Sequence, residues 1–201
     1  MAITDYNSLI LTVGRWSGYG EDSPLPNRIR NAAIDAITGA ENDIDDLLRV
    51  AEMVKRSTFL ATSEFASLPS DCLKPITIGR LEDGREIPVE EKPEKVITDY
   101  QLNYQGPVSW YAQVGLELRL APKPTADLPF SGRITYFARP DRLSDAAPCT
   151  ALLLRYPMVY LYGALKHIAH FIEDDAKQAK WENLQVQQIT RANRTYVIRK
   201  S

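Results

Sequence analysis

The sequence predicts an α+β protein, in which helices from both ends of the chain form a bundle that carries an inserted antiparallel β-rich lobe. Two observations support this fold class. Apolar residues recur with helical spacing near both ends, whereas in the middle they alternate with polar residues. The chain has 201 residues and 44% hydrophobic content, which suffices for an ordered core. We expect the bundle to comprise residues 1–49 and 150–201, and the lobe to comprise residues 50–149.

The N-terminal part of the chain predicts two helices. Thr4 or Asp5 can cap a short helix that ends near Gly14, and the Gly- and Pro-containing segment 17–27 is typical of a loop. Asn27 can cap a long second helix. Its apolar residues form one continuous stripe: Ile29, Ala32, Ala33, Ala36, Ile37, Ala40, Ile44, Leu47 and Leu48. Its other face is acidic and expected to be solvated, through Glu41, Asp43, Asp45 and Asp46.

The middle of the chain predicts antiparallel strands. Apolar and polar residues alternate in four stretches, at 58–63, 110–114, 116–120 and 134–139. Asp83-Gly84 lies between two further β-prone stretches, 76–78 and 87–89, and favours a two-residue hairpin turn between them. The segment 82–106 is rich in Glu, Lys and Pro, and we expect it to be a long exposed connection.

The C-terminal part predicts two further helices. The first carries apolar residues from Tyr156 to Ile172, with Pro157 in its first turn, where a missing N–H is tolerated. The acidic segment 173–175 marks a break, and the last helix runs to about Tyr196. A basic tail at about 191–201 contains no acid and carries Arg191, Arg194, Arg199 and Lys200. These charges can complement the helix dipole, dock on an acidic partner, or touch nucleic acid.

Composition excludes several classes of protein. A formal net charge of −2 argues against a wholly basic DNA-coating protein. The two cysteines, Cys72 and Cys149, provide neither a disulfide framework nor a four-ligand zinc site, which fits a reducing compartment. The most apolar stretch, 151–165, contains Arg155 and Pro157 and is shorter than the about 20 apolar residues that span a bilayer. We therefore expect a soluble protein with no membrane partner.

Catalytic motifs are sparse. His167 and His170 lie three residues apart with Asp174 one helical turn further on, which could supply two imidazoles and a carboxylate to a divalent metal. A polar stripe on an amphipathic helix is the alternative interpretation. The glycine-rich stretch 14–20 lacks the GK[ST] ending of a phosphate-binding loop, and there is no nucleophile elbow. We expect no enzyme and no cofactor. The alternative hypotheses are a small metal-dependent enzyme that uses His167, His170 and Asp174, and a nucleic-acid-binding accessory protein that uses the basic tail.

Several stretches of the chain match motifs of one family in the same order. Residues 153–165 read LLRYPMVYLYGAL, and Asp174-Asp175, Trp181 and the segment 191–194 follow. Upstream lie LPSD at 68–71, ELRLAP at 117–122, TYFAR at 135–139 and LSD at 143–145. This ordered set resembles the head-to-tail adaptor (connector) proteins of tailed bacteriophages with short tails. Related head-completion proteins, such as stoppers, are the alternative.

The resemblance implies an interaction protein of the virion neck, assembled in the host bacterial cytoplasm. It implies a twelvefold ring under the portal protein that extends the DNA channel and attaches the tail nozzle or tube proteins. Genomic DNA would pass without sequence-specific binding. The basic residues Arg191, Arg194, Arg199 and Lys200 are then candidates for portal contact. The acidic residues Glu41, Asp43, Asp45 and Asp46 are candidates for lining the channel, where negative charge would keep DNA from sticking.

Overall fold

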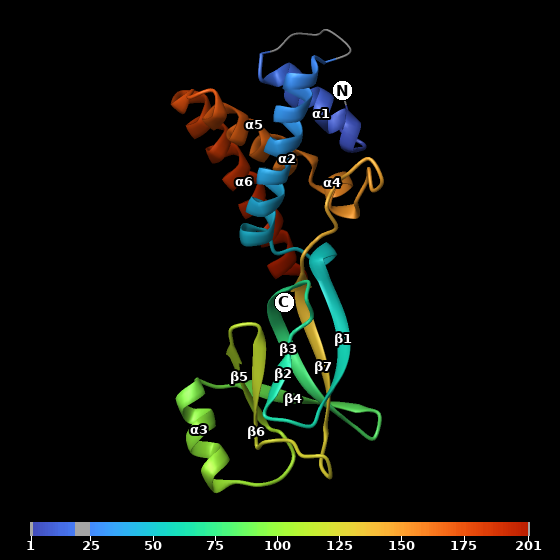
Figure 1. Cartoon of the computed structure of the whole chain (residues 1–201), viewed down its shortest axis with the longest axis vertical. Helices are drawn as coiled ribbons and strands as arrows, with labels where there is room; N and C mark the ends of the chain where they lie inside the picture. The colour runs from blue at the N-terminus through green and yellow to red at the C-terminus, as the bar shows by residue number, and fades with distance from the viewer. Residues whose placement is uncertain (1, 19–24, 201) are drawn as a thin grey trace. The chain divides into compact units, whose positions relative to one another are not determined.

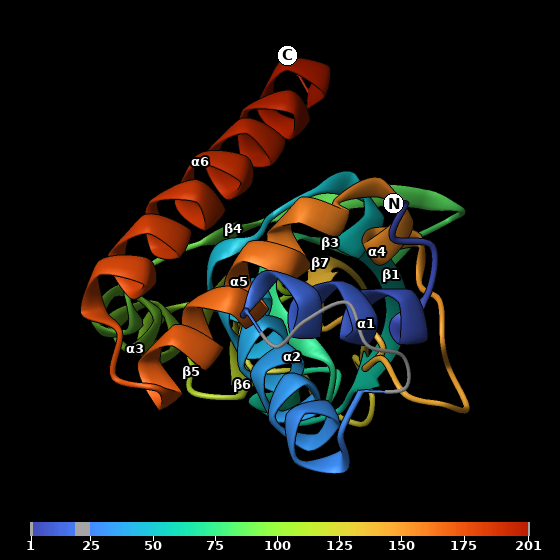
Figure 2. The ribbon, with the colours of Figure 1, turned by 90° about the horizontal axis from the view of Figure 1, so that it is seen from above.

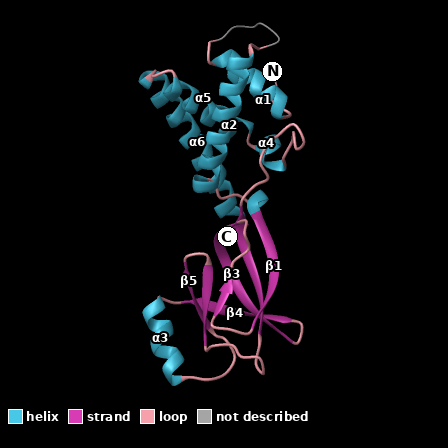
Figure 3. Cartoon of the chain, viewed as in Figure 1, coloured by secondary structure: helices cyan, strands magenta, loops and turns pink. Residues whose placement is uncertain are grey.

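The computed structural model describes residues 2–18 and 25–200, and the side chains of these except at 102–103 and 197–200. The fold class is α+β, as predicted. The chain divides into two compact units. The helical unit comprises Met1–Met53 and Pro140–Ser201, and the sheet unit comprises Val54–Arg139. Figure 3 shows that all the strands belong to the sheet unit.

The helical unit is built around one central helix. Its elements are α1 (Tyr6–Trp16), α2 (Asn27–Leu47), the short 3-10 helix η1 (Ala51–Met53), α4 (Ala151–Arg155), α5 (Pro157–Phe171) and α6 (Asp175–Lys200). Helix α5 lies between α2 and α6 and packs on both (Figures 1 and 2). Segments from the two ends of the chain therefore share one core, which includes Leu9, Ile10, Ile37, Ile44, Leu153 and Tyr160.

Local sequence explains where these helices begin and end. Asp5 accepts a hydrogen bond from the Ser8 backbone N–H, and the Ser8 hydroxyl accepts one from the Asp5 N–H, so α1 begins with a capping box. Pro157 occupies the first turn of α5, as predicted. Glu173 adopts a left-handed conformation with φ 57°, which ends α5 at the expected break.

Three helix ends differ from the prediction. Pro26 and not Asn27 occupies the N-cap position of α2, and no described side chain caps this helix. Gly14 lies inside α1 and is buried, because the Leu25 side chain occupies the space that a Cβ at Gly14 would need. The glycine-rich stretch therefore begins as helix, and its residues Tyr19 and Gly20 lie outside the described residues. Helix α6 continues past Tyr196 to Lys200, so the basic tail is helical.

The sheet unit is a curled seven-stranded sheet. Its strands are β1 (Val54–Ala61), β2 (Phe65–Ser67), β3 (Cys72–Glu82), β4 (Arg85–Glu91), β5 (Trp110–Val114), β6 (Glu117–Ala121) and β7 (Phe130–Ala138), with helix α3 (Glu94–Asn103) between β4 and β5. The spatial order is β1-β7-β3-β4-β5-β6-β2, and only β4 and β5 pair in parallel. Because residues 62–64 alone join the edge strands β1 and β2, the sheet must curl around its core.

That core is formed by the inward residues of all the longer strands. It includes Ile78, Leu118, Leu120, Phe130, Ile134 and Tyr136. The hairpin at Asp83-Gly84 is confirmed: both residues have positive φ, 48° and 76°, and join β3 to β4.

The expected exposed connection at 82–106 is wrong. The segment forms the end of β3, strand β4 and helix α3. Ile97 is fully buried against Ala112 and Ala121, and Tyr100 packs on Trp110 beside it. Gln101 Nε2 also donates to the Leu120 carbonyl at 2.8 Å, so α3 is held on the sheet although most of its other described residues are polar.

Candidate interaction surfaces

The acidic face of α2 is folded into the helical unit. Glu41 is 5% exposed and Asp45 is 7% exposed. The Leu143 backbone N–H donates to Glu41 Oε1 at 2.8 Å, and Arg142 Nη2 donates to Asp45 Oδ2 at 2.7 Å. Burial raises the pKa of Glu41. The expected solvated face is therefore wrong at Glu41 and Asp45, because the chain that re-enters the unit after Pro140 covers them.

Asp43 joins three helices through one oxygen. Its Oδ2 lies 2.6 Å from Lys166 Nζ, 3.0 Å from His167 Nε2 and 3.2 Å from Gln185 Nε2. Burial alone would raise the pKa of Asp43, but these hydrogen bonds outweigh it and lower the pKa to about 2. Of the four carboxylates predicted to line a channel, only that of Asp46 is on an exposed residue.

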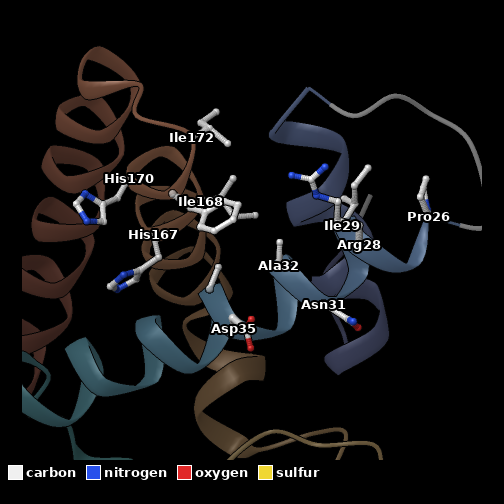
Figure 4. Close-up of a pocket in the computed structure, with 12 residues that line it drawn as sticks. Pro26, Arg28, Ile29, Asn31, Ala32, Asp35, His167, Ile168, His170 and Ile172 are labelled. Carbon is white, nitrogen blue, oxygen red and sulfur yellow. The ribbon is translucent and has the colours of Figure 1, made fainter.

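The histidines and Asp174 are engaged in separate contacts. His167 faces Asp43, His170 Nδ1 lies 3.3 Å from Gln178 Oε1, and Asp174 accepts from the Lys177 backbone N–H at 3.0 Å (Figure 4 shows both histidines). Within residues 2–18 and 25–200, no three His, Cys, Asp or Glu side chains form a group that could hold a metal ion. The described residues therefore provide no metal site for the metal-dependent enzyme hypothesis.

Neither cysteine belongs to a group of described side chains that could bind a metal ion. Cys72 is partly buried, and burial raises the pKa of its thiol to about 11, which keeps it protonated and unreactive at neutral pH. Cys149 is exposed and precedes Thr150, which caps α4.

The basic end of α6 is held rigidly against α2. Asn193 Oδ1 accepts from the Arg49 backbone N–H at 2.7 Å, and its Nδ2 donates to the Leu47 carbonyl at 3.0 Å. Ala192 is buried beside it, whereas Arg191 and Arg194 are exposed. These two arginines are therefore presented to solvent on a fixed helix. The side chains of Arg199 and Lys200 lie outside the described part of the chain.

A groove opens between the first half of α2 and the end of α5 (Figure 4). Its volume is about 930 Å³. Ile29 and Ala32 line one wall, and Ile168, Phe171 and Ile172 line the other, while Arg28 and Asp35 stand at the polar rim. Phe171 is 70% exposed although it is a large aromatic residue. The groove is an apolar surface of the kind that marks a protein contact.

Comparison with known protein families decides the relationship. The family model described as SU10 adaptor protein matches residues 4–199. The chain belongs to the SU10 adaptor protein family. A search of curated proteins gave no match. The family match confirms the resemblance to bacteriophage head-to-tail adaptors, and the adaptor is accordingly a structural protein of the virion neck. Among the described helices of the adaptor, none is long and apolar enough to cross a membrane.

Sequence reasoning missed two parts of the adaptor's surface. The groove escaped notice because its walls come from helices more than 100 residues apart in the chain, and each wall reads as ordinary core. The hydrogen bonds of Asn193 were also missed. The sequence shows only that a polar residue lies beside the apolar stripe of the last helix, and its partners Leu47 and Arg49 are identified by the structure.

Proposed function

We propose that this adaptor forms a ring of twelve subunits under the portal protein, extends the DNA channel and provides the attachment surface for the tail nozzle or tube proteins. The family match over nearly the whole chain carries this proposal. Genomic DNA passes through the ring without sequence-specific binding, and assembly takes place in the host cytoplasm.

A closed ring requires two different, complementary patches on each subunit. The groove between α2 and α5 supplies one apolar patch. A second subunit that buries Phe171 and Ile172 would remove exposed apolar surface from water, which favours association by about 25 cal/mol per Å².

Arg191 and Arg194 form the portal contact in this proposal, together with Arg199 and Lys200. Asn193 supports this role because it fixes the helix that carries the two exposed arginines. A rigid basic surface loses less conformational entropy on docking than a frayed tail does. The alternative is that these charges only complement the helix dipole, and that role requires no fixed position beyond nearness to the helix C-terminus.

Native mass spectrometry of the adaptor mixed with portal protein tests the proposal. We expect a complex of one portal ring with twelve adaptor chains, even if the free adaptor is monomeric. Arg191→Glu with Arg194→Glu should abolish the complex, whereas the matched pair Lys95→Glu with Lys123→Glu should leave it intact. An adaptor that never joins a portal complex would falsify the assignment.

Among Glu41, Asp43, Asp45 and Asp46, the exposed residue is Asp46, and we propose it as the one that faces the channel. In this proposal its negative charge repels passing DNA. Asp46→Lys in assembled particles should slow DNA ejection, measured by dye release. Unchanged retention and ejection would remove α2 from the channel wall.

A further inference from the structure

The outer face of strands β1, β7 and β3 collects hydroxyl and basic side chains. Arg56 pairs across with Thr135, and Thr58 pairs with Arg133. On the other side of β7, Thr135 faces Thr77, and Lys74 lies one step along. Residues two apart in a strand share a face, so Ser131, Arg133 and Thr135 lie on one side of β7 with Arg56 and Thr58 of β1. A bulge between Pro75 and Thr77 puts both Thr77 and Lys74 on this side of β3. The exposed Leu60 lies opposite Ser131 at one end, and the buried Phe137 lies opposite Lys74 at the other. We name this surface the hydroxyl–arginine face: Arg56, Thr58, Lys74, Thr77, Ser131, Arg133 and Thr135.

The opposite side of the same strands faces the core. Ile78, Ile134 and Ala61 are buried there. Arg56, Thr58, Lys74, Thr77 and Ser131 are exposed, and Arg133 and Thr135 are half-buried. The three strands lie side by side in Figure 1. The face is therefore a continuous patch of solvent-facing sheet.

Most polar groups of this face are available for a ligand. Within the described residues, the hydroxyls of Thr58, Thr77, Ser131 and Thr135 make no hydrogen bond, and neither Arg56 nor Lys74 has an ion-pair partner. Arg133 alone is paired, with Glu86 Oε2 at 3.1 Å from its Nη1. Glu86 reaches it across β3 at Gly79, where a larger residue would block its side chain.

The positive charge of this face is a local excess. Between Val54 and Arg139 the sequence holds eleven basic and eleven acidic residues, which balance. On the face itself three cations stand against the one carboxylate of Glu86. Attraction of an anion to the sheet unit must therefore come from this arrangement and not from net charge.

We propose that the hydroxyl–arginine face contacts the sugar–phosphate backbone of double-stranded DNA without reading its sequence. Arg, Lys, Ser and Thr are side chains that bind phosphate oxygens. The hydroxyl–arginine face includes no amide side chain to recognise base edges, and Phe137 beside Lys74 is buried and so not available to stack on bases. This inference rests on the proposed function, which brings duplex DNA past each subunit. The contact is weak and dependent on salt, so a moving duplex can slide along it.

Fluorescence anisotropy with a labelled 30-base-pair duplex tests the contact on the full-length chain. Among the described residues Arg56 and Lys74 are free while Arg133 is paired with Glu86, so two neutralised phosphates predict a slope of about −1.8 for log affinity against log salt. This slope is roughly a 12-fold loss of affinity between 50 and 200 mM. The triple variant Arg56→Gln, Lys74→Gln, Arg133→Gln should weaken binding by about tenfold or more at 50 mM and flatten this slope. The matched triple Lys95→Gln, Lys123→Gln, Lys180→Gln should bind as the parent does.

Weaker binding in the triple variant could also result from misfolding, so a second variant is expected to bind DNA more tightly. Glu86→Gln removes the one carboxylate of the face and frees Arg133, so DNA affinity should rise several-fold. Equal affinity of the two triple variants, or an unchanged affinity in Glu86→Gln, would overturn the inference. So would binding of polyglutamate as tight as that of DNA, since it would assign the face to an acidic protein.

The portal assay keeps the two proposals distinguishable. If the face triple variant joins the portal complex but has lost DNA affinity, both proposals stand. If the parent binds DNA through this face but never joins the portal, the ring proposal fails while the face retains its ligand. If the parent joins the portal and the face variants bind DNA unchanged, only the DNA contact fails.

Discussion

Asp43 shows how one side chain can connect helices that are distant in sequence. Its Oδ2 accepts from Lys166 and His167 of α5 and from Gln185 of α6, while its backbone belongs to α2. Gln185 is 1% exposed, so its amide depends on this carboxylate for a partner. A buried donor left without an acceptor costs more than the bond itself contributes.

Asp43→Asn should therefore destabilise the chain. Loss of the charge-assisted bonds predicts a decrease of about 2 kcal/mol in the free energy of unfolding, measured by urea denaturation. Asp46→Asn is the control, because Asp46 is exposed on the same helix and should change stability little. Equal midpoints for the two variants would contradict the role given to Asp43.

The same substitution changes the pH dependence of stability. The folded-state pKa of Asp43, about 2, lies below its ordinary value of 3.8. The stabilisation from its ionised form is therefore fully present above that ordinary value and is lost as pH falls toward 2. The stability difference between parent and Asp43→Asn should be constant near neutral pH and shrink in acid. A difference that grows as pH falls would reverse the sign and refute this account.

Gly163 of α5 lies at a close helix crossing. A Cβ there would stand 2.7 Å from the Ala40 Cβ and meet the Gln185 amide. In an unhindered helix, glycine to alanine stabilises by about 1 kcal/mol, but overpacking of this crossing should instead cost about 1–3 kcal/mol. Thermal denaturation of Gly163→Ala should show a lower Tm; a higher Tm would mean that the crossing can expand freely.

The charged residues mark the limit of sequence reasoning at this scale. The pattern from Ile29 to Leu48 suffices to predict a helix with an apolar stripe and an acidic remainder. Whether a carboxylate meets water depends on partners such as Arg142, which lies 97 residues from Asp45. Helical periodicity carries no information about such distant contacts, so Glu41 and Asp45 were assigned to solvent.

Among the elements, α6 combines an apolar contact with a polar one near its end. Ile189 and Ala192 are buried and Trp181 stacks on Tyr162 of α5. Asn193 hydrogen-bonds to Leu47, the last residue of α2, and to Arg49 just beyond it. Those bonds satisfy a carbonyl at the α2 C-terminus that has no partner within its own helix.

Asn193→Ala should loosen the end of α6. We expect a loss of about 1–2 kcal/mol in stability and faster amide exchange over the residues around Arg191 and Arg194. Thr195→Ala is the matched control, because the Thr195 hydroxyl bonds only to the Arg191 carbonyl of its own helix. If exchange rates were the same in both variants, Asn193 would not be the anchor.

Elements with local signals were predictable, and an element held only by contacts distant in sequence was not. The Asp83-Gly84 turn and Pro157 act on neighbouring residues, so their effects are visible in the sequence. Helix α3 has polar composition and one fully buried residue, Ile97, whose partners Ala112 and Ala121 come from later strands. Nothing in its own ten residues distinguishes it from a connection.

At the scale of the whole molecule, each unit has its own core. The sheet unit is continuous in sequence, whereas the helical unit needs both ends of the chain. Residues 54–139 expressed alone should therefore give a single cooperative thermal transition with β-sheet circular dichroism. A transition without cooperativity would show that the sheet unit requires the helices to fold.

The distribution of charge over the two units is more informative than the net charge. The overall value of −2 hides opposite local arrangements. In the helical unit Glu41, Asp43 and Asp45 of α2 form internal hydrogen bonds and ion pairs, while Arg191 and Arg194 of α6 are exposed. In the sheet unit equal numbers of acids and bases leave one basic face.

The pairing of β1 with β7 bears on how such chains diversify. Val54 and Phe137 lie opposite each other in the ladder, so the chain departs from the helical unit and returns to it through adjacent backbones. Paired Cα atoms in an antiparallel ladder are about 5 Å apart. Recombination between phage genomes could thus exchange the whole inserted segment for any module with similarly spaced ends, and the helices would keep their own packing.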